Sequence, residues 1–201
     1  MISTGQKFIF LHIPKTGGCS VIKCLESYCD VKKFKWGHPT FGGYYRVFNY
    51  HKWDINDYKI FTFVRNPYDR LVSTYNYLKA GGTTPGDRKI RDSLNLFTLT
   101  FEEFVHLIAD TDTRGKIQHC LPQVKFIEPE QGWDKINIFR FENINNDFTH
   151  ACEYVGIGSH KLPHLNKSKH THYTEYYNDS TRKLVHDIYK EDIEAFNYTC
   201  E

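Results

Sequence analysis

The chain has 201 residues, with 26 Lys and Arg against 24 Asp and Glu, and a formal net charge of +2 at pH 7. This length fits one core, so we expect residues 1–201 to form a single domain. The near-neutral balance argues against a nucleic-acid binder, which typically carries a strong basic excess. No apolar run approaches the roughly 20 residues of a membrane span and no signal-peptide pattern precedes the first apolar run, so we predict a soluble, cytoplasmic protein.

Short apolar runs alternate with amphipathic segments along the chain. Buried strands are predicted at 7–13, 58–64 and 135–144. Helices are predicted at 18–28, 67–79, 99–111, 145–157 and 179–198, with a loop at 80–86. This alternation predicts an α/β fold, a P-loop-like three-layer sandwich with a central parallel sheet flanked by helices.

The segment PKTGGCS at 14–20 joins the first predicted strand to the first predicted helix. Ligands of open α/β sheets bind beyond the carboxyl ends of the strands, where helix N-termini offer N–H groups and a partial positive charge. Gly17 and Gly18 let the backbone approach a ligand closely, and Lys15 adds a mobile charge. Further N–H groups and hydroxyls come from Thr16, Cys19 and Ser20. The segment therefore predicts a phosphate site, although a plain strand–turn–helix connection would show similar glycines.

The order of these residues differs from a Walker A loop. That pattern, G-x-x-x-x-G-K-[ST], places its glycines before the lysine, whereas Lys15 and Thr16 here precede Gly17 and Gly18. No hydrophobic strand ends in an acidic residue suited to magnesium. A P-loop-type small-molecule kinase using ATP and magnesium stays the alternative, and a non-catalytic nucleotide-binding protein is a third reading.

A second candidate anion site lies in FTFVRNPYDRLVSTYNYL at 61–78. Arg65 leaves the strand and Ser73 follows eight residues later, and such a pair can bind a phosphate through a bidentate guanidinium and a hydroxyl. HIPKTGG and FVRNPYDRLVSTY together resemble the PAPS-dependent sulfotransferases. The match is closest to the carbohydrate branch, with the heparan sulfate uronyl 2-O-sulfotransferases and their bacterial relatives.

This resemblance implies the donor 3′-phosphoadenosine 5′-phosphosulfate (PAPS), with 3′-phosphoadenosine 5′-phosphate (PAP) as product and no metal. It implies that the 3′-phosphate is bound by Arg65 and Ser73. It implies that the 5′-phosphosulfate is bound by Lys15, Thr16, Gly17, Gly18, Cys19 and Ser20.

The resemblance extends over nearly the whole chain. IFRFENI at 138–144, HCLPQ at 119–123 and LPHLNKSKHTHYTEYY at 162–177 each resemble a family segment. In relatives the last of these packs over the nucleotide, which implies contacts from Lys167, Ser168 and Lys169. Relatives usually have Thr where this chain has Cys19. A thiol at a helix N-terminus is expected to have a lowered pKa and to be sensitive to oxidation.

Sulfuryl transfer needs a base for the acceptor and a positive charge on the leaving phosphate. Lys15 suits the second task, and a histidine suits the first. Of the eleven histidines, His38 follows a Gly and precedes a Pro, and the carbohydrate branch places its base in a similar Gly-His. We therefore predict His38 as the base, with His51 as second candidate and His12 as a structural residue. The tail histidines His164, His170 and His172 lack partner ligands, so no metal is predicted.

The acceptor is less specified by the sequence. Residues 39–57 and 80–98 are expected to line its site. Aromatic residues near His38 suit a sugar or a phenol, namely Trp36, Phe41, Tyr44 and Tyr45. The basic cluster of Arg88, Lys89 and Arg91 suits an anionic glycan, and equally suits plain solvent exposure. We predict a hydroxyl acceptor, a carbohydrate by resemblance, while small alcohols, phenols and amines stay open.

Overall fold

The computed structural model describes residues 1–31, 37–128, 135–162 and 171–199. The chain divides into two compact units. Unit 1 comprises Met1–Arg65 and Gln123–Lys167, and unit 2 comprises Asn66–Pro122 and Ser168–Glu201. The expectation of a single domain over the whole chain stays a prediction.

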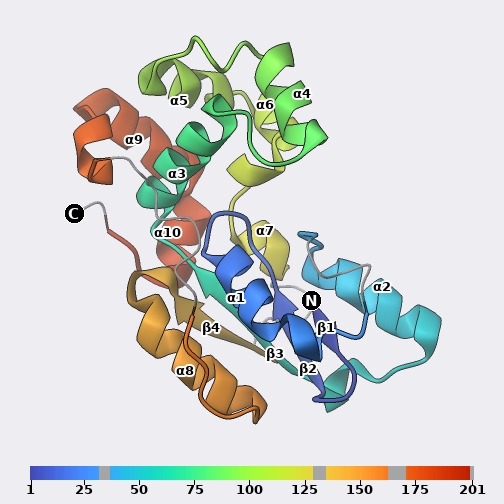
Figure 1. Cartoon of the computed structure of the whole chain (residues 1–201). Helices are drawn as coiled ribbons and strands as arrows, with labels where there is room; N and C mark the ends of the chain where they lie inside the picture. The colour runs from blue at the N-terminus through green and yellow to red at the C-terminus, as the bar shows by residue number, and fades with distance from the viewer. Residues whose placement is uncertain (32–36, 129–134, 163–170, 200–201) are drawn as a thin grey trace. The chain divides into compact units, whose positions relative to one another are not determined.

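Unit 1 contains a four-stranded sheet (Figure 1). Its strands are β1 (Ile2–Ser3), β2 (Phe8–Leu11), β3 (Lys59–Val64) and β4 (Ile136–Arg140), in that spatial order. β2, β3 and β4 run parallel, with Leu11 opposite Thr62 and Val64 opposite Arg140. β1 pairs antiparallel with β2 and was not predicted, because two residues are too few to show a pattern. The predicted α/β fold with a central, mostly parallel sheet flanked by helices is confirmed.

The core of unit 1 is rich in phenylalanine. Phe8 and Phe10 of β2 and Phe61 and Phe63 of β3 point to one face, because side chains alternate along a strand. The helices α1 (Gly18–Leu25) and α8 (Ile144–Val155) contribute their buried residues to the same cluster. Side chains of β2 and β3 on the opposite face are also buried, as a parallel sheet requires.

Two further helices of unit 1 are α2 (Phe41–His51) and α7 (Val124–Ile127). α2 was not predicted, since the pair Gly42–Gly43 resembles a turn. Its N-cap is Thr40, whose hydroxyl accepts a hydrogen bond from the Gly43 N–H at 3.3 Å. The buried Tyr44 anchors α2, because its hydroxyl donates to the carbonyl of Phe10 at 3.1 Å.

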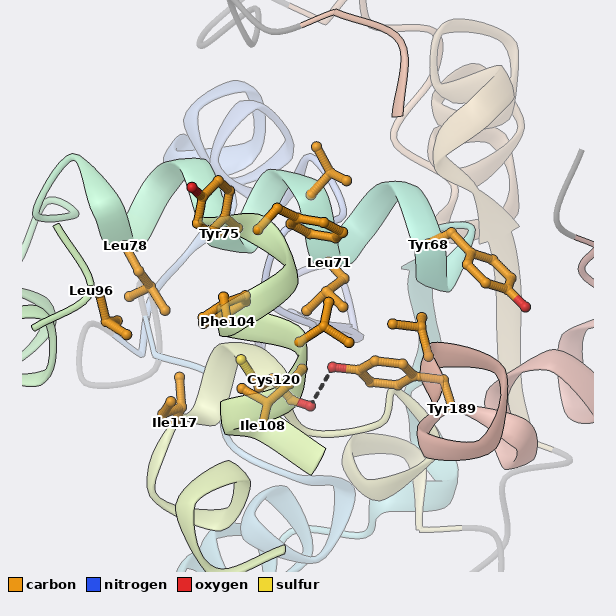
Figure 2. Close-up of a cluster of buried hydrophobic side chains, with 14 residues drawn as sticks. Tyr68, Leu71, Tyr75, Leu78, Leu96, Phe104, Ile108, Ile117, Cys120 and Tyr189 are labelled. Carbon is orange, nitrogen blue, oxygen red and sulfur yellow. Dashed lines mark hydrogen bonds between the residues drawn. The ribbon is translucent and has the colours of Figure 1, made fainter. Parts of the chain in front are cut away.

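Unit 2 is helical in the part of the chain that the structure describes. Its helices are α3 (Pro67–Lys79), α4 (Pro85–Ser93), α5 (Phe101–Ala109), α6 (Thr111–Lys116), α9 (Asp179–Ile188) and α10 (Lys190–Phe196). Apolar side chains of α3, α5 and α9 share one buried cluster with Tyr189 and the segment around Cys120 (Figure 2), and Ile90 of α4 and Ile193 of α10 pack against it. Within it the hydroxyl of Tyr189 donates to the carbonyl of Cys120 at 2.8 Å. This bond satisfies a buried polar group at the centre of the cluster.

Two helix boundaries differ from the prediction. Residues 80–86 were expected to be a loop, yet α4 begins within them, after Thr84, with a capping box formed with Asp87. Its signal, Thr-Pro-Gly-Asp, was present in the sequence. The single helix expected over 179–198 is two helices, because the backbone at Tyr189 has φ −110° and ψ 23° and interrupts the α-helical bonding.

A buried arginine connects α3 to α10 and to the segment around Cys120 within unit 2. Arg70 on α3 is 1% exposed, and its guanidinium donates to the carbonyls of Leu121 at 2.7 Å and His119 at 3.2 Å. The carboxylate of Asp192 on α10 lies 4.0 Å away and is itself fully buried. Such a buried charge requires these partners, because burying it without them would be strongly unfavourable.

No helix in the described ranges is long and apolar enough to cross a membrane.

Candidate active site

The connection from β2 to α1 is a tight loop with two left-handed residues. Lys15 has φ 67° and Gly17 has φ 80°, and Gly17 is the N-cap of α1. The buried Thr16 hydroxyl donates to the carbonyl of Ile13 at 2.9 Å, so it holds the loop from within. The N–H of Ser20 donates to the carbonyl of Gly17 at 3.0 Å. Thr16 and Ser20 thus contribute to the shape of the loop.

The N–H groups of Gly18 and Cys19 head helix α1. No preceding helical turn supplies carbonyls to the first N–H groups of a helix, and their dipoles favour an anion. Lys15 is half-buried and precedes the first residue of α1 by three positions. This part of the loop therefore has the donors and the charge that a phosphate needs.

Helix α1 begins close to a buried histidine. His12, the residue after β2, is 3% exposed, and a Cβ added at Gly18 would overlap its imidazole. A Cβ at Gly17 would in turn meet side chains of Ile144 and Phe141. The two glycines are thus required by close packing, in addition to the backbone conformation of Gly17.

Gly18→Ala is expected to lower the free energy of unfolding by about 1–3 kcal/mol, because the new methyl group must displace His12. Chemical denaturation with the wild type in parallel measures this. Gly115→Ala is the matched control, since a Cβ there meets nothing within 4 Å. Unchanged stability of the Gly18 variant would contradict the position of His12 under the loop.

His38 lies beside His12. The ring centroids are 4.1 Å apart, and Nδ1 of His38 is 3.0 Å from the backbone carbonyl oxygen of His12. A carbonyl oxygen only accepts, so this hydrogen bond requires the proton on Nδ1. Nε2 then carries the lone pair. The hydrogen bond thus holds the neutral imidazole of His38 in the Nδ1–H tautomer.

The other two histidine hypotheses have different outcomes. His12 is buried against Gly18 and packs on Phe10 with ring centroids 5.7 Å apart, in keeping with a structural role. His51 ends α2, the helix that starts three residues after His38, and it stacks on Trp53 at 4.4 Å. Eleven residues of α-helix span about 16 Å, so His51 is far from the start of α2.

Arg65 lies directly after β3 and contacts the loop. It is 6% exposed, and Nη1 donates to the carbonyl of Lys15 at 3.2 Å. Its guanidinium also lies over the ring of Phe141, 4.1 Å from the centroid. The structure thus brings Arg65 and the 14–20 loop together within unit 1. The role of Phe141 was missed, since no local pattern pairs an aromatic ring with an arginine distant in sequence.

Several predicted site residues lie elsewhere or outside the described part of the chain. Ser73 is on α3 in unit 2 and is 7% exposed. The basic cluster Arg88, Lys89 and Arg91 is on α4, also in unit 2. The predicted contacts Lys167, Ser168 and Lys169, the aromatic residue Trp36, and the histidines His164 and His170 fall outside the described residues.

The prediction that aromatic residues near His38 contact the acceptor is partly wrong. Phe41 is 1% exposed and Tyr44 is fully buried, so both belong to the core and cannot stack on a ligand. Tyr45 is 42% exposed and packs edge-on against Phe41, with centroids 6.3 Å apart. Of these three rings, Tyr45 alone presents a surface to a ligand.

The expected reactivity of Cys19 is also corrected. Burial raises the pKa of its thiol above the ordinary value, and the nearby Lys15 charge, which lowers it, is the smaller influence. The lowered pKa expected from the helix N-terminus is therefore not found, although Cys19 is exposed at the surface.

Among the described residues, no group of three or more His, Cys, Asp and Glu side chains could hold a metal ion. An open hollow of about 450 Å³ occurs in unit 2, and its lining includes Tyr68, Arg182, Lys183 and His186. None of the site residues predicted from the sequence lines it.

Comparison with known proteins gives one family match. The sequence profile described as "Sulfotransferase family" matches residues 1–199. Among curated proteins, none matches the sequence. A solved structure of mouse sulfotransferase SULT7A1 complexed with PAP is similar at 15% identity and a TM-score of 0.46, covering 98% of this chain and 68% of that chain.

Proposed function

The chain belongs to the sulfotransferase family, which the match over residues 1–199 establishes, and from this premise we propose its reaction in detail. The chain transfers a sulfuryl group from PAPS to a hydroxyl of a carbohydrate acceptor. His38 is the general base, and Lys15 stabilises the leaving phosphate. The observation that carries this proposal is the hydrogen bond between His38 Nδ1 and the His12 carbonyl, which leaves Nε2 as the acceptor of a proton.

The 14–20 loop suits the 5′-phosphosulfate. Gly18 and Cys19 offer N–H groups at the start of α1, and Lys15 offers its ammonium. This set matches an anion with several acceptor oxygens. The loop contacts of Thr16 and Ser20 preserve this shape.

The reaction forms a bond between the acceptor oxygen and sulfur, and breaks the bond between sulfur and the bridging phosphate oxygen. Negative charge develops on that oxygen, and the Lys15 ammonium neutralises it. The hydroxyl proton goes to Nε2 of His38, while the Nδ1 proton stays in its bond to the His12 carbonyl. The products are the sulfated acceptor and PAP.

Arg65 suits the 3′-phosphate of the donor. Its guanidinium is fixed by the Lys15 carbonyl and by the ring of Phe141, so little side-chain entropy remains to be lost on binding. Ser73, Lys167, Ser168 and Lys169 are kept in the proposal on the resemblance of their segments alone. The carbohydrate acceptor also follows from that resemblance, and the exposed ring of Tyr45 supports it as a stacking surface in the first turns of α2.

Thermal unfolding in the presence of nucleotides tests the donor. A ligand at about 100 times its dissociation constant stabilises the native state by about 2.7 kcal/mol. For a chain of this size we expect PAP to raise Tm by about 5–10 °C. ATP with magnesium is the comparison. If ATP with magnesium stabilises the protein and PAP does not, the proposal fails and the kinase alternative replaces it.

A further inference from the structure

Arg65 directly follows β3, at a point where neither neighbouring strand pairs with the chain any longer. The last pairs of the β3 ladders are Thr62 with Leu11 on one side and Val64 with Arg140 on the other. Arg65, one residue further, lies beyond both. Its backbone N–H and carbonyl are therefore outside the sheet, although the residue is almost completely buried. Buried backbone groups need partners.

The side-chain amide of Gln123 supplies those partners. The N–H of Arg65 donates to Oε1 of Gln123 at 2.9 Å, and Nε2 of Gln123 donates to the carbonyl of Arg65 at 2.9 Å. One planar amide thus binds both polar groups of one residue, as the backbone N–H and carbonyl of a residue on a paired strand would do. Gln123 is fully buried and directly precedes α7.

The two hydrogen bonds with Gln123, which we call the Gln123 clamp, fix the backbone position from which the Arg65 side chain extends. From a Cα fixed by two hydrogen bonds, the guanidinium reaches the Lys15 carbonyl at 3.2 Å and the ring of Phe141 at 4.1 Å. Without the clamp the backbone at the strand end could rotate, and the guanidinium would lose its position. Small displacements of a binding group are costly to affinity.

We propose that Gln123 is a positioning residue for Arg65, and that through Arg65 it sets the preference for a nucleotide with a 3′-phosphate. The inference rests on the proposed function, in which Arg65 binds that phosphate. Gln123 itself touches the Arg65 backbone and needs no contact with the nucleotide. In the sequence, HCLPQ at 119–123 is only a segment that resembles the family. The contacts of its glutamine, Gln123, with the Arg65 backbone are the basis for the positioning role.

The test measures binding of PAP and of adenosine 5′-monophosphate, which lacks the 3′-phosphate, by titration calorimetry. Gln123→Met keeps the length of the side chain and removes both hydrogen bonds. We expect PAP affinity to fall about tenfold, the loss of roughly one charge-assisted contact, and affinity for the monophosphate to change less than about twofold. Gln118→Met is the matched control, because this glutamine is exposed.

A double-mutant cycle separates positioning from a general structural effect. In an Arg65→Met background, Gln123→Met is expected to cause no further loss of PAP affinity, since the clamp then has no guanidinium to position. Equal losses for both nucleotides, or additive losses in the cycle, would overturn the inference. If Gln123→Met does not fold, Gln123→Glu replaces it, because glutamate still accepts from the Arg65 N–H but cannot donate to the carbonyl.

The outcomes also separate this inference from the proposed function. If the wild type binds PAP no better than the monophosphate, the 3′-phosphate assignment itself is wrong. If the wild type discriminates and the Gln123 variants discriminate equally well, the role of Gln123 alone is wrong.

Discussion

Replacement of His38 by alanine is expected to lower kcat by about 10²- to 10⁴-fold, the usual contribution of a general base. The imidazole is the group that would take the hydroxyl proton, and with Nδ1 donating to the His12 carbonyl, Nε2 of the neutral ring carries the lone pair that accepts it. PAP affinity should change little, since no step of donor binding uses this ring. Single-turnover assays with PAPS, together with calorimetric PAP titrations, measure both quantities.

His38→Asn sharpens the experiment. The asparagine amide can still donate to the His12 carbonyl, as Nδ1–H does, but it cannot take a proton. It should therefore be as slow as the alanine variant. His106→Ala is the control, because His106 is exposed on α5. Near wild-type turnover in both His38 variants would rule out His38 as the base.

Lys15→Met is expected to lower kcat by about 10²- to 10³-fold, comparable with the loss of one preorganised donor to a developing charge. Methionine keeps most of the apolar length of the side chain and removes the ammonium. PAPS affinity should fall as well, but by less than kcat, because charge on the bridging oxygen is largest in the transition state. The two effects are separated by measuring kcat and KM for PAPS.

The matched control for Lys15 is Lys23→Met on α1, the helix that follows the loop. Lys23 is exposed and pairs with Glu26 at 2.8 Å, a surface ion pair that contributes little. Its replacement should leave both kinetic constants unchanged. A Lys15→Met enzyme with a raised KM and an unchanged kcat would show that Lys15 only binds the donor, and the electrostatic role would then be abandoned.

The elements with clear periodicity could be predicted from the sequence. β3 and α3 match the expected segments almost to the residue, because an apolar run and a helix-starting proline marked them. β1 is too short for a pattern, and α2 contains two glycines in its first turn. The interruption at Tyr189 has no proline or glycine to mark it in the sequence.

The candidate site also has a part that could be predicted from the sequence and a part that could not. The loop with Lys15 and its glycines was visible in the sequence because residue types and spacing carry the chemistry. The contacts that hold the site residues in position could not be predicted, because they come from segments that are far apart in the sequence. His12 holds His38 by its backbone, and Gln123 binds the Arg65 backbone across 58 positions of sequence. The predicted low pKa of Cys19 failed because burial outweighs the favourable charge of Lys15.

The backbone of Lys15 has a consequence for engineering. Its φ of 67° is left-handed, a conformation that costs about 1–2 kcal/mol for a residue other than glycine. Glycine at position 15 would remove that cost and would also remove the ammonium on which the proposed chemistry depends. A library selected only for heat resistance would therefore favour an inactive variant at this position. Stability and turnover oppose each other here within a single residue, so selection at position 15 must read out sulfate transfer directly.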